Sequence, residues 1–206
     1  MSSTIPGAPS KLTPIYTPRH PSAEESPSTQ SLIAALNLQP HIEGGYFAEI
    51  DRNPLVIPNP FLPQENEGDA GDDDDAVRNA STSIYYLLSR GAPQGCFHRN
   101  KGRTVHTVIE GRGRYVLIHA DEEGEKKRVE SFVVGRDFER GEKSVWVVEG
   151  GKFKGSYLIG GERLLVSETV VPGFEYADHD FLTRDGLERL VKEEQVEELE
   201  WLVRRS

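Results

Sequence analysis

Two histidines carry most of the chemistry that this sequence could perform. Side chains alternate along a strand, so His98 shares a face with Asn100, and His106 shares a face of the next strand with Thr104. If Thr104 points into the interior, so does His106, and the two imidazoles could then form an acid–base pair near neutral pH. The competing interpretation, which we favour, is that His106 is packed in the core or at its rim.

A series of short strands must position these residues. Runs rich in β-branched and aromatic residues are separated by turn signals roughly every 8–12 residues, which is typical of an all-β barrel or sandwich. We expect strands at 81–89, 104–110, 114–119, 128–134, 143–148, 155–159 and 164–171.

Helices are expected on both sides of this region. Ser28 or Thr29 could cap a short helix that includes Leu36. Near the C-terminus, Thr183 or Asp185 could cap a single helix that reaches about residue 204. Its apolar side must pack on the barrel or on a second subunit.

Two segments are expected to lie outside the packed domain. Residues 1–27 are rich in Ser, Thr and Pro and have little to bury, which predicts a disordered tail. An acidic run within about 58–80 predicts a solvated loop, because like charges at this density repel one another. The expected division is therefore this tail, a domain over 28–182 that contains the loop, and a helix over 183–206.

Composition limits which kinds of partner the protein could bind and in which cellular compartment we expect it. The formal net charge of −10 argues against a nucleic-acid-binding protein, although seven of these charges come from acidic residues within 65–75. Cys96 is the only cysteine, which excludes an intrachain disulfide and suits a reducing compartment. No signal-peptide pattern and no run of 18 apolar residues is present. We expect a cytoplasmic protein, with the nucleus also open, and no nucleic-acid or membrane partner.

Four segments in a fixed order carry a family resemblance. They are Pro40-His41-Ile42-Glu43-Gly44-Gly45-Tyr46-Phe47, Ser83-Ile84-Tyr85-Tyr86-Leu87-Leu88, Phe97-His98-Arg99 and the run from Thr169 to Asp178 that contains Pro172-Gly173-Phe174. Over roughly residues 28–182 the chain resembles the cupin superfamily, and within it the branch called cupin-5, a domain of unknown function. The resemblance implies a double-stranded β-helix, the jelly-roll barrel also found in sugar-nucleotide epimerases.

The residues at the metal-binding positions of the general cupin pattern differ in this chain. His98 matches the first histidine of that pattern, but Asn100 stands at the second histidine and Thr104 at the carboxylate. In the second motif, Lys154 stands at the histidine position. A transition metal needs three or four His, Asp, Glu or Cys ligands, so we expect no metal at these positions and no cofactor.

Other residues could line a pocket in such a barrel. Glu43 and Glu49 flank the Gly-Gly turn and could bind polar groups of a ligand, although Glu43 could equally stabilise the turn. Tyr46, Tyr85 and Phe153 could form an apolar wall, or belong to the ordinary core. Together with Asn100, Thr104 and His106, these residues are our predicted ligand-binding set.

Three functions remain open at this point. The leading one is a metal-independent cupin that binds a small polar metabolite of the sugar or nucleotide-sugar class, with an epimerase-like or isomerase-like activity as a further step. In that activity His98 would be the base and Lys154 would stabilise an enolate. The alternatives are a non-catalytic binding or scaffold protein and a metal-dependent cupin enzyme. A homodimer is expected, because exposed sheet edges need covering.

Overall fold

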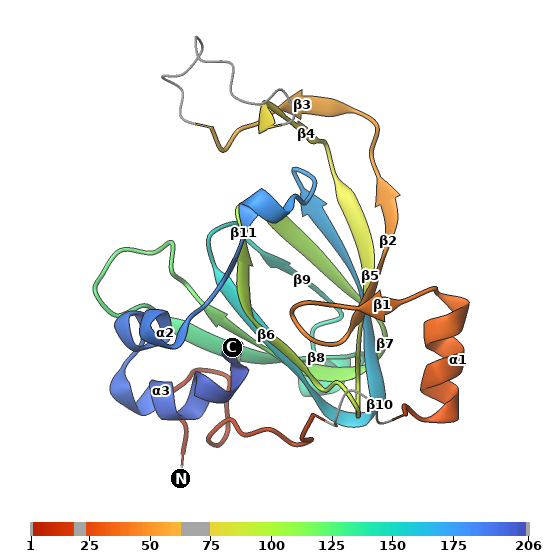
Figure 1. Ribbon diagram of the computed structural model, residues 1–206. Helices are drawn as coiled ribbons and strands as arrows, with labels where there is room; N and C mark the ends of the chain where they lie inside the picture. The colour runs from red at the N-terminus through yellow and green to blue at the C-terminus, as the bar shows by residue number, and fades with distance from the viewer. Residues whose placement is uncertain (1, 19–23, 63–74, 205–206) are drawn as a thin grey trace.

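The computed structural model describes residues 2–18, 24–62 and 75–204 of the 206-residue chain. Its strands curl around a common interior, and short helices pack outside them (Figure 1). The predicted all-β fold with helical segments near both termini is therefore confirmed. No helix within the described ranges is long and apolar enough to cross a membrane.

The described chain contains the following elements. The strands are β1 (Gln39–Pro40), β2 (Tyr46–Arg52), β3 (Val56–Pro58), β4 (Val77–Asn79), β5 (Thr82–Ser89), β6 (Gln94–Asn100), β7 (Arg103–Ile118), β8 (Val129–Val134), β9 (Val145–Val148), β10 (Phe153–Val171) and β11 (His179–Phe181). The helices are α1 (Pro27–Ala35), α2 (Arg184–Leu190) and α3 (Glu193–Leu199), with 3₁₀ turns η2 (Phe138–Arg140), η3 (Tyr176–Asp178) and η4 (Glu200–Leu202).

The two longest strands, β7 and β10, hold the barrel together. They pair antiparallel from Phe153 opposite Ile118 to Val171 opposite Arg103. The other edge of β10 pairs with β6 near its start and with β5 near its end, while β7 also pairs with β8 and β9. A strand with different neighbours at its two ends must bend, and the register shifts around Gly160 mark that bend.

Gly111 allows β7 to follow the same bend. Its φ is +84°, and a Cβ at this position would lie 1.9 Å from the carbonyl oxygen of Arg163. A residue with a side chain could adopt neither this conformation nor this approach. We predicted two separate strands here, over 104–110 and 114–119. The structure instead has one continuous strand, because the glycine bends the ladder without ending it.

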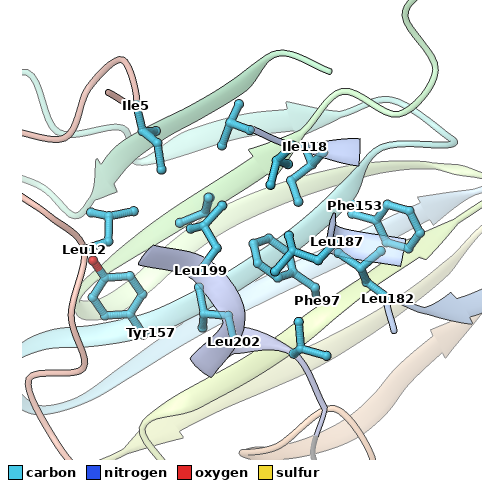
Figure 2. Packing of buried hydrophobic residues seen from close by; sticks show 14 residues of the cluster. Ile5, Leu12, Phe97, Ile118, Phe153, Tyr157, Leu182, Leu187, Leu199 and Leu202 are labelled. Carbon is cyan, nitrogen blue, oxygen red and sulfur yellow. The ribbon is translucent and has the colours of Figure 1, made fainter. Parts of the chain in front are cut away.

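The apolar residues form two main clusters on opposite sides of the sheet. One fills the barrel interior with residues such as Val108, Trp146 and Val166. The other joins the outer face of the barrel to the C-terminal helices through Phe97, Ile118 and several leucines (Figure 2). Full burial of one such side chain stabilises the fold by about 1.5–3 kcal/mol.

The N-terminal segment differs from the prediction of a disordered tail. Ile5 and Leu12 are buried in the cluster between the barrel and the C-terminal helices (Figure 2). The carboxylate of Glu198 accepts hydrogen bonds from the Leu12 backbone at 2.7 Å and from the Ser3 hydroxyl at 2.6 Å. The backbone oxygens of Pro6 and Gly7 also accept hydrogen bonds from Ser131 and Arg114, so residues 2–18 are held by both apolar and polar contacts despite their proline-rich composition. Residues 19–23 lie outside the described residues.

The structure differs from the prediction at the N-cap of α1 and in the acidic loop. Helix α1 is capped by Ser26, rather than by Ser28 or Thr29. The predicted acidic loop over 58–80 contains β4, which pairs with β3, while residues 63–74 lie outside the described part of the chain.

The single C-terminal helix predicted from about 185 to 204 is wrong. Thr183 does cap α2, as one of the two expected caps, but the chain then leaves the helical conformation at Val191 and Lys192. Val191 is fully buried in an extended conformation. The break turns α3 so that Leu199, like Leu187 of α2, faces the same core.

We predict that Ile5 contributes to stability as a core residue. Ile5→Ala should lower the free energy of unfolding by about 2–4 kcal/mol, because it removes a buried side chain and leaves a cavity. The matched control is Ile15→Ala, since Ile15 lies in the same segment but is 55% exposed. Chemical denaturation of both variants measures the difference, and equal small losses would show that the segment does not pack in solution.

Candidate functional site

A cavity enters the barrel between β2, β5, β6 and β10. The volume of this cavity is about 130 Å³. Its lining combines buried charged groups with apolar side chains. The residues are His41, Glu43, Phe47, Glu49, Arg52, Thr82, Ile84, His98, Asn100, Lys154, Glu168, Val170, Phe174, Glu175 and Tyr176.

Glu43 is buried in this cavity and faces three imidazoles. Its Oε1 lies 2.9 Å from His179 Nε2, and its Oε2 lies 3.3 Å from His98 Nε2 and 3.5 Å from His41 Nδ1. Burial raises the pKa of the Glu43 carboxyl, but attraction to His98 and hydrogen bonds with His179 and His41 hold this pKa well below its usual range. Glu43 is therefore an ionised carboxylate at neutral pH.

The Gly-Gly turn places Glu43 against β6. Gly44 and Gly45 both have positive φ, and a Cβ on Gly44 would lie 2.2 Å from the carbonyl oxygen of Gln94. This close crossing lets the backbone carbonyl of Glu43 accept a hydrogen bond from the Cys96 amide at 2.7 Å. The Glu-Gly-Gly sequence therefore delivers a carboxylate into the barrel on a fixed backbone.

The ring of His98 is held in one tautomer by its own strand. Its Nδ1 lies 2.9 Å from the carbonyl oxygen of Cys96, which can only accept a hydrogen bond, so Nδ1 carries the proton. Burial lowers the pKa of His98 to about 4, although the nearby Glu43 opposes this shift. The neutral ring therefore presents the lone pair of Nε2 towards Glu43.

A second buried polar group contains Lys154, Glu168 and His106. Lys154 Nζ lies 2.8 Å from Glu168 Oε2 and 3.0 Å from His106 Nε2. Burial raises the pKa of Glu168, but Lys154 and then His106 outweigh it and lower this pKa far below its usual range. Burial and the positive charge of Lys154 lower the pKa of His106, which also stacks on Trp146 with ring centroids 4.8 Å apart.

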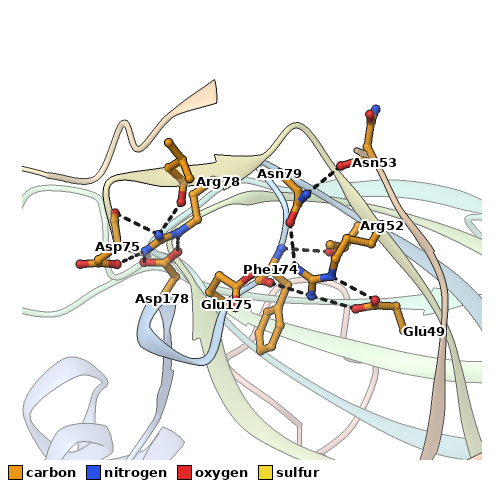
Figure 3. A network of polar contacts seen from close by, with 11 residues as sticks. Glu49, Arg52, Asn53, Asp75, Arg78, Asn79, Phe174, Glu175 and Asp178 are labelled. Carbon is orange, nitrogen blue, oxygen red and sulfur yellow. Dashed lines mark hydrogen bonds and ion pairs between the residues drawn. The ribbon is translucent and has the colours of Figure 1, made fainter. Parts of the chain in front are cut away.

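Arg52 forms part of the cavity rim. Its guanidinium donates to Glu49 of the same strand and to Glu175 of the segment that follows β10, with N–O distances of 2.9 and 2.7 Å (Figure 3). It also donates to Asn79 of β4. One side chain thus connects β2, β4 and the Phe174–Glu175 segment, and so fixes the position of one wall.

Arg78 and Asp178 form a buried ion pair behind this rim. Arg78 Nε lies 2.6 Å from Asp178 Oδ2 and Nη2 lies 3.3 Å from Oδ1 (Figure 3). Lys101 Nζ adds a contact with Asp178 Oδ1 at 3.2 Å. Because Asp178 directly precedes His179, this pair anchors the start of β11. A bidentate pair with both side chains buried gives a well-defined geometry.

Residues 30–182 match the family described as Cupin superfamily (DUF985), Cupin_5. The chain belongs to this family. A relative from Saccharomyces cerevisiae, "Uncharacterized protein YML079W", is 43% identical over 187 residues, which cover 88% of this chain and 89% of the relative. The predicted family and its double-stranded β-helix fold are thus confirmed.

Two solved structures have the same overall fold as this cupin. A hypothetical protein from Leishmania major is 25% identical with a TM-score of 0.69, and covers 88% of this chain and 100% of its own. Protein SO0799 from Shewanella oneidensis is 21% identical with a TM-score of 0.68, and covers 89% of this chain and 100% of its own.

The cavity brings five of the ten predicted site residues together. They are Glu43, Glu49, His98, Asn100 and Lys154. The usual cupin metal positions lack the usual ligands in this member. Lys154 places an ammonium group there and donates to Glu168 and His106, and Asn100 and Thr104 supply no charged ligand.

The other five predicted residues do not line the cavity. Tyr46 and Tyr85 pack in the cluster with Leu87 and Leu165, and Phe153 belongs to the cluster that meets the C-terminal helices. Thr104 is buried in the β7 ladder. His106 is also buried and contacts the cavity lining through Lys154 and Glu168, as the core interpretation of this histidine expected.

Several cavity residues were not predicted from the sequence. His41 stands in a quoted motif but was given no role, and Arg52, Glu168 and Phe174 were not singled out. Glu168 faces His106 in the β7–β10 register, so a predicted strand pairing could have found it. His179, which contacts Glu43 although it is not in the lining set, directly follows the segment from Thr169 to Asp178 and could be recognised only once β11 was placed beside β6.

We predict that Glu168 stabilises the fold by compensating the buried Lys154. Glu168→Gln should lower the free energy of unfolding by about 3–5 kcal/mol, because it leaves a buried ammonium group without its carboxylate. The matched control is Glu149→Gln, which breaks an exposed pair with Arg103 at 2.9 Å and should cost less than about 1 kcal/mol. Urea denaturation measures both losses, and similar values would refute the assignment.

The Glu168 effect should also depend on pH. A carboxyl whose pKa is lowered by folding stabilises the native state above its unfolded pKa, near 4.5, and this stabilisation is lost as pH falls towards the folded pKa. The stability difference between the wild type and Glu168→Gln should therefore be constant around neutral pH and shrink below about pH 4.5. Denaturation at a series of pH values measures it. A difference that grew on acidification would contradict the ionised state of Glu168.

Proposed function

We propose that this cupin binds a compact, hydroxylated metabolite in the barrel cavity. The observation that carries the proposal is a set of acceptors that lack donors. Asn100 Oδ1 is buried with no hydrogen-bond partner among the described residues, and His98 directs a lone pair towards the same cavity. A buried polar group left unpaired costs about 1–3 kcal/mol, so a ligand that donates hydrogen bonds would recover this energy.

The rest of the lining supports a ligand with both polar and apolar faces. Phe47, Ile84, Val170 and Phe174 give the cavity apolar surface next to the acceptors. A sugar ring has this combination, with hydroxyl donors around its edge and C–H groups on its faces. We expect the cavity, with a volume of about 130 Å³, to take a single sugar ring. A nucleotide attached to the sugar would extend out of the cavity.

The finer proposal is an isomerase-like or epimerase-like proton transfer. Lys154 has three ammonium protons, of which Glu168 and His106 accept two, and its side chain also lines the cavity. The third proton can be donated to a carbonyl oxygen that gains negative charge, while the His98 lone pair removes a proton from the adjacent carbon. A binding protein without catalysis would use the same cavity for the ligand alone.

Blocking the cavity tests the binding proposal. Ile84→Trp should abolish the increase in melting temperature that a bound metabolite produces, because the larger ring occupies the ligand space. Tyr85→Trp is the matched control, since it is the next residue of β5 but packs in the cluster outside the cavity. Monosaccharides, nucleotide sugars and hydroxy acids are the probes. An increase that persists in Ile84→Trp, or no increase with any probe, would contradict binding in this cavity.

We also propose that this cupin forms a homodimer in the cytoplasm. Val145 and Val147 are exposed on β9, which pairs only with β7 among the described strands. An exposed apolar edge of this kind favours association. Sedimentation equilibrium should give twice the mass of the chain, and a monomer at micromolar concentration would contradict the proposal.

A further inference from the structure

Glu43, His98 and His179 converge from three separate parts of the chain. Their ligand-forming atoms all lie within 4.8 Å of one another, and no other group of this kind is found among the described residues. Glu43 comes from the Gly-Gly turn, His98 from β6 and His179 from β11. The two rings are nearly parallel, with centroids 5.4 Å apart.

The ligand-forming atoms of this cluster face one another. The Nδ1 proton of His98 is donated to the carbonyl oxygen of Cys96, so Nε2 is the ring nitrogen left to face Glu43. It lies 3.3 Å from Glu43 Oε2, while His179 Nε2 lies 2.9 Å from Glu43 Oε1. An ion placed among these atoms would contact one oxygen and two nitrogens.

Glu43, His98 and His179 are each held in place by other parts of the chain. The contact from His98 Nδ1 to a backbone carbonyl is the support that metal-binding histidines commonly have. His179 begins β11, which pairs with β6 and follows the buried Arg78–Asp178 ion pair. Glu43 is fixed by the crossing of its backbone over β6. The cluster is therefore preorganised, with little side-chain freedom to lose on binding.

We propose that Glu43, His98 and His179 bind one divalent first-row transition-metal ion. Two imidazole nitrogens and one carboxylate oxygen form a donor set that such ions take while keeping open positions for other ligands. Only His98 is shared with the usual cupin metal positions. We expected no metal because of the residues at those positions, and that expectation did not consider Glu43 and His179. His41, 3.5 Å from Glu43 Oε2, lies beside the site.

The charges around the triad indicate which ligands the bound ion would favour. Lys154 is neutralised by Glu168 at 2.8 Å, which leaves Glu43 as the uncompensated charge closest to the ion. A divalent ion with a single carboxylate carries a net charge of +1. The open positions would therefore favour an anionic oxygen, such as a carboxylate or an enolate. This step rests on the proposed binding function, since it assumes that the metabolite occupies the same cavity. It replaces the proposed proton transfer by His98, because a metal-bound Nε2 has no lone pair left to act as a base.

The direct test is metal binding by untagged protein that has been dialysed against a chelator. Titration with Zn²⁺ and with Co²⁺, followed by calorimetry and by the visible spectrum of Co²⁺, should give one ion per chain with nitrogen ligands. Glu43→Gln, His98→Ala and His179→Ala should each weaken binding by more than about 100-fold, because the loss of supporting residues alone costs 10–100-fold.

A matched control is His119→Ala. His119 is also buried, and it lies 3.1 Å from Glu130 and 3.3 Å from Glu122, but these residues do not form a group within ligand distance of one another. It should leave metal binding unchanged. No stoichiometric binding by the wild type would overturn the proposal, as would binding that survives in the near-isosteric Glu43→Gln variant or is lost in His119→Ala.

The cavity variant separates this proposal from the proposed function. Ile84→Trp changes no residue of the triad and should keep one metal ion per chain while losing the metabolite. Metabolite binding by chelator-treated protein that takes up no metal would support the proposed function and refute the metal site. Circular dichroism of each variant shows whether a loss reflects the site or the fold, and Glu43→Gln is decisive where an alanine variant does not fold.

Discussion

The continuous pairing of β7 with β10 is the constraint on which the rest of this protein depends. Two strands of 16 and 19 residues remain hydrogen-bonded along most of their length while both bend. The bend gives each of them a different set of neighbours at its two ends, and the sheet consequently closes around an interior. Lys154 and Glu168 stand near opposite ends of β10, yet the curvature lets their side chains meet inside the barrel.

Burial of charge follows from this closure. The interior contains two carboxylates, an ammonium group and several imidazoles, which would be costly to bury singly. Glu168 is compensated by Lys154, whereas Glu43 has imidazole rings around it. The two groups therefore differ in kind. The Lys154 group pairs a carboxylate with an ammonium group, whereas the Glu43 group brings a carboxylate oxygen and imidazole nitrogens together, which are the atoms that bind metal ions.

Much of the fold could be predicted from the sequence, because alternation and turn residues report local structure directly. The Glu43-Gly44-Gly45 segment also identified one site residue, since only glycine tolerates that backbone. The limits were physical. A glycine that bends a strand resembles a glycine that ends one, as Gly111 shows. For Tyr46 and Tyr85 both a pocket wall and ordinary core were open, because the strand period gives alternation but not which face is inside.

Contacts that join distant segments were beyond the reach of local patterns. Nothing near Glu43 in the sequence indicates His179, which arrives 136 residues later, and the alternation around His106 does not reveal that Glu168 faces it across the ladder. The apolar residues Ile5 and Leu12 gave too weak a signal against a proline-rich background. Glu198, which accepts a hydrogen bond from the Leu12 backbone, lies 186 positions away.

The contact between Leu12 and Glu198 sets an order of assembly. These residues are separated by 186 positions, so their contact cannot form until Glu198 has left the ribosome. The barrel strands are synthesised in between and can pair before then. The carbonyl oxygens of Pro6 and Gly7 bind to Ser131 and Arg114 of those strands, which are made earlier than Glu198. The same short segment is therefore held by partners that become available at two different times during synthesis.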